Sequence, residues 1–158
     1  MRVAILTISD SVARGEREDL SGPALVARCR ELGWDVTSAL RCSDDAAEVR
    51  SQLRAVVDSG HTDVLLTTGG TGLGPRDNTP EASLDVGDRV VPGLAEEIRR
   101  RGAEKTPTAL LSRGVAVVRH STLIVNLPGS PRGAVESLDI VAQLIPHAIE
   151  VLRGARHD

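Results

Sequence analysis

The stretch that most constrains the fold is Val64 to Ala82, VLLTTGGTGLGPRDNTPEA, where an apolar run passes into a glycine-rich turn and then a helix start. Val64 to Leu66 are apolar β-formers in a run short enough for a buried strand. The glycines that follow permit backbone conformations closed to other residues, and their N–H groups can surround an anion. Thr79 is a good N-cap and Pro80 suits the first helical turn. The stretch therefore predicts a strand, an anion-binding loop and a helix in succession.

Two interpretations of this loop stay open from the residues alone. In the first, Arg76 clamps a phosphate with two N–H groups and Asp77 holds Mg²⁺. In the second, glycine and proline only turn the chain, and Arg76 pairs with Asp77. The loop has about a dozen residues, whereas ordinary connections have roughly 2–6, which favours a functional loop. No Gly-Lys-Ser/Thr or GxGxxG sequence is present in it, so it differs from both familiar phosphate motifs.

Composition limits the class of protein. A chain of 158 residues predicts one domain over residues 1–158. There is no Phe or Tyr and one Trp, so the core must consist of Val, Leu, Ile and Ala, and aromatic stacking on nucleic-acid bases is largely ruled out. The net charge of −3 also argues against a nucleic-acid partner. The chain lacks a signal-peptide pattern and any long apolar run, so we expect a soluble, cytoplasmic protein without membrane association.

Cysteine and histidine give no metal-binding pattern. Cys29 and Cys42 are far apart and lack CxxC spacing, which predicts two buried thiols in a reducing compartment. The histidines show no ligand spacing such as HxxxH, so no zinc site is predicted and surface positions are expected for all of them. They are His61, His120, His147 and His157.

The first part of the chain alternates strands and helices. The run Val3 to Ile8 is almost continuously apolar, as in a strand covered on both faces, and it delivers Ser9 and Asp10 to its carboxyl end. Ligands of open α/β sheets bind at that end, so both residues are pocket candidates, although Asp10 could equally only cap or kink the loop. The expected succession is a strand at 3–8, a polar loop at 11–19, a helix at 21–32, a strand at 34–40, a helix from 43 to 60 and a strand ending at 67.

The second part is predicted to add helices and a hairpin. The runs 115–118 and 123–125 are two short β-segments joined by a polar turn, which predicts an antiparallel pair and hence a mixed sheet. Ser130 and Pro131 form a second N-cap and first-turn pair after Asn126. The expected helices are 80–86, 94–101, a turn of helix that opens at 106–107 and ends at 112–114, 131–143 and 146–152.

Four motifs in order, TTGGTG with RDNTPE, PGLAE, LSRG and NLPGSP, carry a resemblance to a known family. The chain resembles the molybdenum cofactor biosynthesis domain of the Mog and MoaB type, the molybdopterin adenylyltransferases, which also occurs in gephyrin and the plant Cnx proteins. The resemblance extends from Thr7 to Glu136. It implies a three-layer α/β/α sandwich with a mostly parallel mixed sheet, assembled as a homotrimer. It also implies that Mg²⁺ and ATP are used to adenylylate molybdopterin, with release of pyrophosphate.

The resemblance also implies roles for individual residues. Asp77 and Asp44 match carboxylates that position Mg²⁺ and the triphosphate, with Asp45 as the alternative to Asp44, and Ser112 matches a serine near the substrate phosphate. The implied substrate-binding positions are Thr68, Gly69, Gly70, Thr71, Gly72, Arg76, Asn126, Pro128, Gly129 and Ser130, with Ser9, Asp10 and Glu96 as further candidates.

Alternatives to this enzyme remain at the level of sequence. A carrier of the same fold would bind molybdopterin without turnover, and the related domain of competence-damage-type proteins suggests nucleotide hydrolysis. The family also raises the prospect of a partner protein that inserts molybdate. No Phe or Tyr is available to stack on the pterin ring, so the ring must be held in another way.

Overall fold

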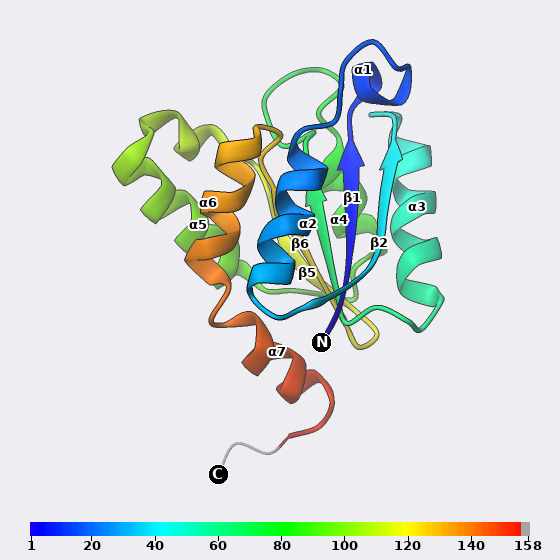
Figure 1. The fold of residues 1–158 in the computed structure, drawn as a ribbon, viewed down its shortest axis with the longest axis vertical. Helices are drawn as coiled ribbons and strands as arrows, with labels where there is room; N and C mark the ends of the chain where they lie inside the picture. The colour runs from blue at the N-terminus through cyan, green and yellow to red at the C-terminus, as the bar shows by residue number, and fades with distance from the viewer. Residues whose placement is uncertain (156–158) are drawn as a thin grey trace.

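The computed structural model describes residues 1–155; residues 156–158, and with them the expectation for His157, lie outside the described part. Its centre is a six-stranded mixed sheet in the order β2-β1-β3-β6-β5-β4 (Figure 1). The first four of these strands are parallel, and β5 and β4 join antiparallel. The strands are β1 (Arg2–Ile8), β2 (Asp35–Cys42), β3 (Val64–Thr68), β4 (Arg89–Val90), β5 (Ala116–Arg119) and β6 (Thr122–Leu127).

Helices cover both faces of the sheet, and the alternation of side chains along each strand explains why. In β1, Val3 and Ile5 pack into one buried cluster, whereas Ala4 and Leu6 pack into the other. The three-layer α/β/α fold expected from the sequence is therefore confirmed. One face carries α2 (Ser21–Glu31), α5 (Pro92–Lys105), α6 (Pro131–Val141) and α7 (Ile145–Leu152), and the other carries α3 (Ala46–Asp58) and α4 (Thr79–Val86).

The strand register brings the candidate loops to one edge of the sheet. Thr7 of β1 lies opposite Thr68 of β3, and Thr68 lies opposite Leu127 of β6. The segments that leave these three strands must therefore start side by side. In Figure 1 they gather at the upper end of the sheet, where the strand arrows point.

Three local features differ from the sequence-based expectations. The segment expected to be a polar loop begins with a short helix, α1 (Asp10–Ala13), because Ser9 accepts a hydrogen bond from Val12 N. The short strand β4 was not expected. Its two residues are exposed, and they are extended because they pair with Val117 and Val118 of β5. The turn of helix expected to open at 106–107 and end at 112–114 is present as a 3₁₀ helix, η1 (Pro107–Leu111).

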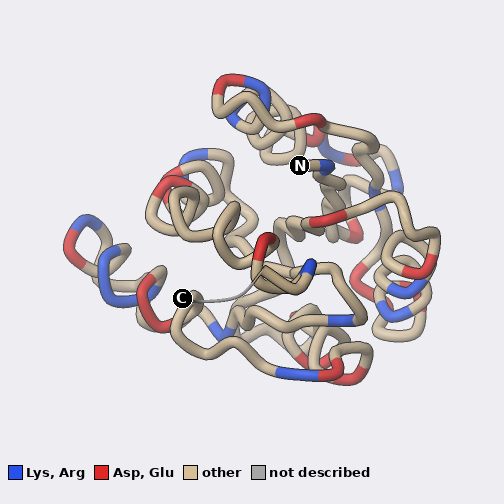
Figure 2. Tube along the Cα trace, turned by 90° about the horizontal axis from the view of Figure 1, so that it is seen from below, with Lys and Arg blue, Asp and Glu red and all other residues tan. Residues whose placement is uncertain are grey.

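The expected positions of both cysteines and of three histidines are confirmed. Cys29 and Cys42 are free and buried, and His61, His120 and His147 are exposed. Among the described residues, no helix is both long and apolar enough to cross a membrane. In the view of Figure 2, basic and acidic residues alternate along the outer helices and do not collect on one face.

Candidate active site

Two cavities flank the loops at the carboxyl edge of the sheet. The first, here called the Asp77 cavity, has a volume of about 480 Å³ and is lined by Ser9, Asp44, Asp77 and Gly70, among others. The second, here called the Ser112 cavity, has a volume of about 750 Å³ and lies between α5, η1 and α6. Ser130 lines both cavities, so the two spaces are neighbours.

The turn after β3 depends on glycine at two positions. Gly69 and Gly70 have φ angles of 102° and 68°, in the left-handed region. A Cβ on Gly69 would strike the carbonyl oxygen of Ile8, and one on Gly70 would strike Oγ1 of Thr79. The loop is held against the start of α4 by Thr79, whose hydroxyl donates to Gly69 O at 2.9 Å. Thr79 was expected to be the N-cap of the helix. In the structure it is the first residue of α4, and Asn78 occupies the N-cap position.

Asp77 folds back into the same loop. Its Oδ2 accepts a hydrogen bond from Gly74 N at 2.9 Å. A Cβ on Gly72 or Gly74 would lie only 2.8 or 2.9 Å from that oxygen. These glycines thus leave room for the carboxylate, which borders the Asp77 cavity together with Asp44.

Asp44 reaches this cavity from the end of β2 and is locked to Asp10. Asp10 N donates to Asp44 Oδ2 at 2.8 Å, and Asp44 N donates to Asp10 Oδ1 at 3.0 Å. Burial raises the pKa of Asp44, and the neighbouring carboxylates of Asp10 and Asp77 add to the effect, against the hydrogen bond from Asp10 N. A cation in the cavity would relieve this concentration of negative charge.

Asp45 has a different place, which separates the two adjacent candidates. Its carboxylate caps α3 by accepting a hydrogen bond from Glu48 N at 3.0 Å. The side chain is exposed at the helix end, and Asp45 does not line the Asp77 cavity. Geometry therefore favours Asp44 as the partner of Asp77.

Arg76 has a partner that neither interpretation of its loop names. Its guanidinium pairs with Asp10, not with Asp77, through Nε and Nη2 at 2.6 and 3.0 Å from the carboxylate oxygens. This hydrogen bonding lowers the pKa of Asp10 to about 2, with the hydrogen bond from Asp44 N as the next contribution. Arg76 and Asp10 line neither cavity; their ion pair joins α1 to the loop of residues 69–77, here called the glycine loop.

Asp44 and Asp77 fit Mg²⁺ that arrives with a phosphate ligand. Mg²⁺ is usually held by one or two carboxylates, with water and substrate phosphate completing its coordination. Within residues 1–155, no group of three or more His, Cys, Asp or Glu side chains is arranged to hold a metal alone. The donor set is thus suited to a shared magnesium ion and not to an independent protein cage.

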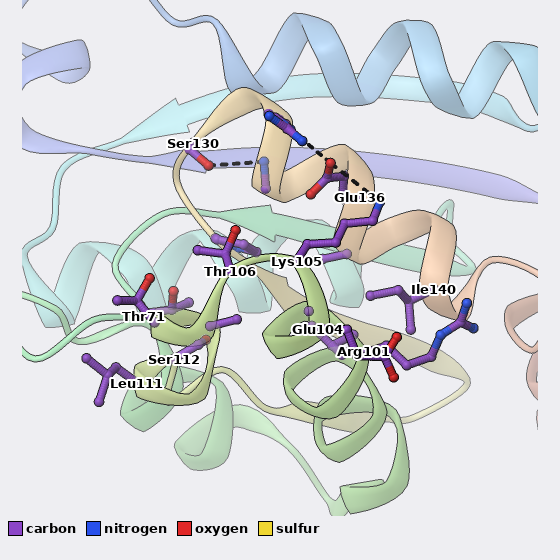
Figure 3. A pocket seen from close by; sticks show the side chains of 18 of the residues that line it. Thr71, Arg101, Glu104, Lys105, Thr106, Leu111, Ser112, Ser130, Glu136 and Ile140 are labelled. Atoms are coloured by element: carbon purple, nitrogen blue, oxygen red, sulfur yellow. Dashed lines mark hydrogen bonds and ion pairs between the residues drawn. The ribbon is translucent and has the colours of Figure 1, made fainter.

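The Ser112 cavity is built differently, as Figure 3 shows. Its walls include the aliphatic side chains of Leu73, Ile98, Leu111 and Ile140. Charged groups stand at α5 and α6, where Lys105 lies 3.6 Å from Glu136, and Glu136 also accepts a hydrogen bond from Arg132 at 2.9 Å. Ser112 also lines this cavity, together with Thr71 and Gly72 of the glycine loop.

The loop after β6 completes the partition between the cavities. Thr68 donates its hydroxyl hydrogen bond to Pro128 O at 2.7 Å, which joins this loop to β3. A Cβ on Gly129 would lie 3.3 Å from the Cα of Gly69, so the two loops are in close contact. Ser130 caps α6 by accepting a hydrogen bond from Gly133 N at 3.0 Å.

The structure places most, but not all, of the candidate residues at these cavities. Asn126 is buried, and its amide nitrogen donates to Thr67 Oγ1 and Ser83 Oγ, both at 3.0 Å. Its Oδ1 accepts from Val115 N, so the side chain joins β6 to β3, to α4 and to the residue before β5, and it lines neither cavity. Glu96 is exposed on α5 and also lies outside both. The Asp77 cavity collects Ser9, Asp44, Thr68, Gly69, Gly70, Asp77, Gly129 and Ser130, and the Ser112 cavity collects Thr71, Gly72, Ser112, Pro128 and Ser130.

Two residues at the site were missed from the sequence. Asp19 lines the Asp77 cavity with its side chain 6% exposed, and it accepts hydrogen bonds from Thr7 Oγ1 at 2.8 Å and Gly22 N at 2.9 Å. Its position shortly before the helix start at Ser21 was the available signal. Arg113 contacts the glycine loop, and its place directly after Ser112 in LSRG was the signal for it.

The fold and the loops at one edge of its sheet define a class of protein: an α/β/α domain in which two glycine-containing loops separate a cavity of about 480 Å³ with acidic groups from one of about 750 Å³ with aliphatic walls. The chain belongs to the family described as the probable molybdopterin binding domain, which matches residues 4–147.

Proteins with similar sequences and structures carry names from molybdenum cofactor biosynthesis. The chain is 37% identical over 153 residues to the molybdenum cofactor biosynthesis bifunctional protein of Synechococcus elongatus, covering 97% of this chain and 48% of that protein. It thus spans about half the length of that relative. It is 35% identical over 175 residues to the molybdopterin adenylyltransferase of Escherichia coli K12, covering 98% and 86% of the two chains. The solved structure of the molybdopterin biosynthesis enzyme MoaB from Thermus thermophilus matches with a TM-score of 0.91 and 47% identity over 99% of both chains.

Proposed function

We propose that this protein is a molybdopterin adenylyltransferase, which transfers AMP from Mg·ATP to molybdopterin and releases pyrophosphate. The name of the Escherichia coli relative supports the activity. The observation that carries the proposal is the shared wall: Ser130 borders both cavities, with Asp44 and Asp77 on one side and Ser112 on the other. A reaction between two bound anions needs this arrangement, because each anion must be held while their repulsion is offset.

The Asp77 cavity is assigned to the triphosphate of ATP. Backbone N–H groups of the glycine loop and hydroxyls such as that of Ser9 are suitable phosphate donors. Asp44 and Asp77 would hold Mg²⁺, whose charge, when the ion is bound, neutralises the phosphate oxygens and favours departure of pyrophosphate. The raised pKa of Asp44 fits a carboxylate that is completed by a cation.

The Ser112 cavity is assigned to molybdopterin. Its volume of about 750 Å³ suits a small-molecule ligand. In this proposal, aliphatic walls such as Ile98 and Ile140 contact the faces of the pterin ring, in place of the Phe and Tyr that the chain lacks. Ser112 lines this cavity, and in this proposal its hydroxyl donates a hydrogen bond to the terminal phosphate of the substrate.

The bond changes follow from this placement. An oxygen of the molybdopterin phosphate forms a bond to the α-phosphorus of ATP, and the bond from that phosphorus to the bridging oxygen of pyrophosphate breaks. No covalent bond to the protein is required, so the residues act by positioning and by charge. The loops at Gly69 and Ser130, which separate the two cavities, determine the direction from which one substrate approaches the other.

We further propose that the protein works in the cytoplasm as a homotrimer and passes its product to a molybdate-inserting partner. The bifunctional relative supports coupling to another step, since this chain matches only 48% of it. Sedimentation of the purified protein tests the assembly: a stable monomer would contradict the trimer.

The activity is tested with purified protein, molybdopterin and Mg·ATP, with Asp77→Asn in parallel and adenylylated molybdopterin detected by chromatography. We expect product from the wild type and little from the variant. Equal product from both would contradict the role of Asp77. Pterin binding without product from the wild type would indicate a carrier instead of an enzyme, and AMP release from a nucleotide sugar without molybdopterin would indicate hydrolysis.

A further inference from the structure

Arg113 contacts three carbonyl groups of the glycine loop. Its Nε donates to Gly72 O at 2.8 Å, and its Nη2 donates to Asp77 O at 2.6 Å. Its backbone N–H donates to Thr71 O at 2.8 Å. Nη1 pairs with Glu81 in the first turn of α4, so one side chain joins both ends of the loop to the helix that follows it.

These contacts fix the part of the loop that carries Asp77. The carboxylate of Asp77 is oriented by Gly74 N within the loop, but the loop itself is largely exposed from Leu73 to Arg76. An exposed glycine-rich segment has few means of keeping one conformation. The guanidinium of Arg113, 35% exposed, supplies fixed donors in a planar fork, a geometry that Lys does not reproduce.

The position of Arg113 in the chain links the two cavities. The preceding residue, Ser112, lines the larger cavity, while Arg113 holds the loop that bears Asp77 on the smaller one. The segment is also held from behind, because Arg99 donates to Ser112 O at 3.3 Å and to Gly114 O at 2.7 Å. Ser112 and Arg113 are adjacent in the chain. Their placement therefore sets the distance between the Ser112 hydroxyl in the larger cavity and the Asp77 carboxylate at the smaller one.

We propose that Arg113 is a positioning residue that keeps the carboxylate of Asp77 at a fixed position relative to Ser112. This inference rests on the proposed adenylyl transfer. Arg113 acts through Asp77 and through the loop carbonyls, and it does not touch the reacting atoms. Loss of the Arg113 guanidinium should therefore slow turnover more than it weakens binding of the pterin. A misplacement of about 1 Å can cost on the order of 100-fold in rate.

The test is a double-mutant cycle of Arg113→Lys and Asp77→Asn, with kcat, KM for molybdopterin and the affinity for Mg·ATP measured in all four proteins. We expect Arg113→Lys to lower kcat roughly 10- to 100-fold with a KM for the pterin within about threefold of wild type. In the Asp77→Asn background, the same change should alter kcat and Mg·ATP affinity less than about twofold, because its target is already lost.

Arg119→Lys is the matched control. Arg119 also pairs bidentately with a carboxylate, that of Asp58, at 2.9 and 3.0 Å, and donates to a backbone carbonyl, that of Val86. It lies at the opposite end of the sheet and lines neither cavity. Its variant should keep wild-type kcat, and an equal loss in both variants would show general destabilisation and overturn the proposal.

Equal effects of Arg113→Lys in both backgrounds would also overturn it, because Arg113 would then act independently of Asp77. Arg113→Gln, which retains one donor for a loop carbonyl, replaces the lysine variant if that protein fails to fold. If the wild type binds Mg·ATP but makes no product, the adenylyl transfer is wrong, while the coupling in Mg·ATP affinity still decides whether Arg113 positions Asp77.

Discussion

Arg76 and Asp10, 66 residues apart in the chain, form a two-point ion pair at 2.6 and 3.0 Å. The pair fastens the glycine loop to α1 (Asp10–Ala13), and the carboxylate of Asp10 accepts Asp44 N as well. Three segments that leave different parts of the sheet are thereby joined next to the Asp77 cavity. The guanidinium that sequence suggested as a phosphate clamp serves in this structure to hold the loops.

This pair predicts a pH-dependent difference between the wild type and Asp10→Asn. The pKa of Asp10 is lowered from 3.8 to about 2, so its contribution is complete above pH 3.8 and is lost as the pH falls through about 2. Because Arg76 is well exposed, we expect the substitution to lower the free energy of unfolding by about 1 kcal/mol near neutral pH. Urea unfolding followed by Trp34 fluorescence should show the difference shrinking between pH 3.8 and about 2. A difference that stays constant across this range would contradict the assignment.

Gly69 and Gly33 offer a comparison of clash against strain. Both have positive φ angles, of 102° and 76°, but a Cβ on Gly33 meets nothing within 4 Å, whereas one on Gly69 strikes Ile8 O. Gly33→Ala should cost about 1–2 kcal/mol of stability with normal turnover of the folded protein. Gly69→Ala should cost more than Gly33→Ala and should also lower turnover, because the loop must move. Equal losses in thermal unfolding and activity would show that the close approach at Ile8 is unimportant.

Asn126 is predicted to matter for stability more than for chemistry. Its three hydrogen bonds join β6 (Thr122–Leu127) to Thr67, Ser83 and Val115. Asn126→Ala leaves buried partners unpaired, and we expect a loss of about 2–3 kcal/mol in the free energy of unfolding. Activity per folded molecule should stay within about threefold of wild type. A loss of turnover with unchanged stability would instead place Asn126 at a substrate.

The layers of the fold were predictable because they depend on local patterns. The apolar runs at 3–8 and 64–66 are too hydrophobic for a half-exposed strand, and glycines mark the ends of the helices between them. The two-residue strand β4 (Arg89–Val90) was not predictable, since its order comes from pairing with β5 (Ala116–Arg119).

The candidate site was predictable in its loops and less so in its side chains. Motif resemblance pointed to Asp77, Asp44 and Ser112, but contacts decide where a side chain faces. Arg76 faces Asp10, a residue 66 positions away, and Asn126 faces the core. Such choices depend on tertiary distances that neither spacing nor residue type contains.

The central claim is that two carboxylates, on the loops that follow β2 and β3, meet at one cavity and serve one reaction. Asp44→Asn and Asp45→Asn test it directly, because the residues are adjacent and only Asp44 lines the Asp77 cavity. Asn is as good an N-cap as Asp, so Asp45→Asn should keep its fold and its activity. We predict that Asp44→Asn lowers kcat for adenylylated molybdopterin by at least about 100-fold while Asp45→Asn stays within about twofold of wild type. Equal turnover in both variants, or a loss confined to Asp45→Asn, would contradict the account.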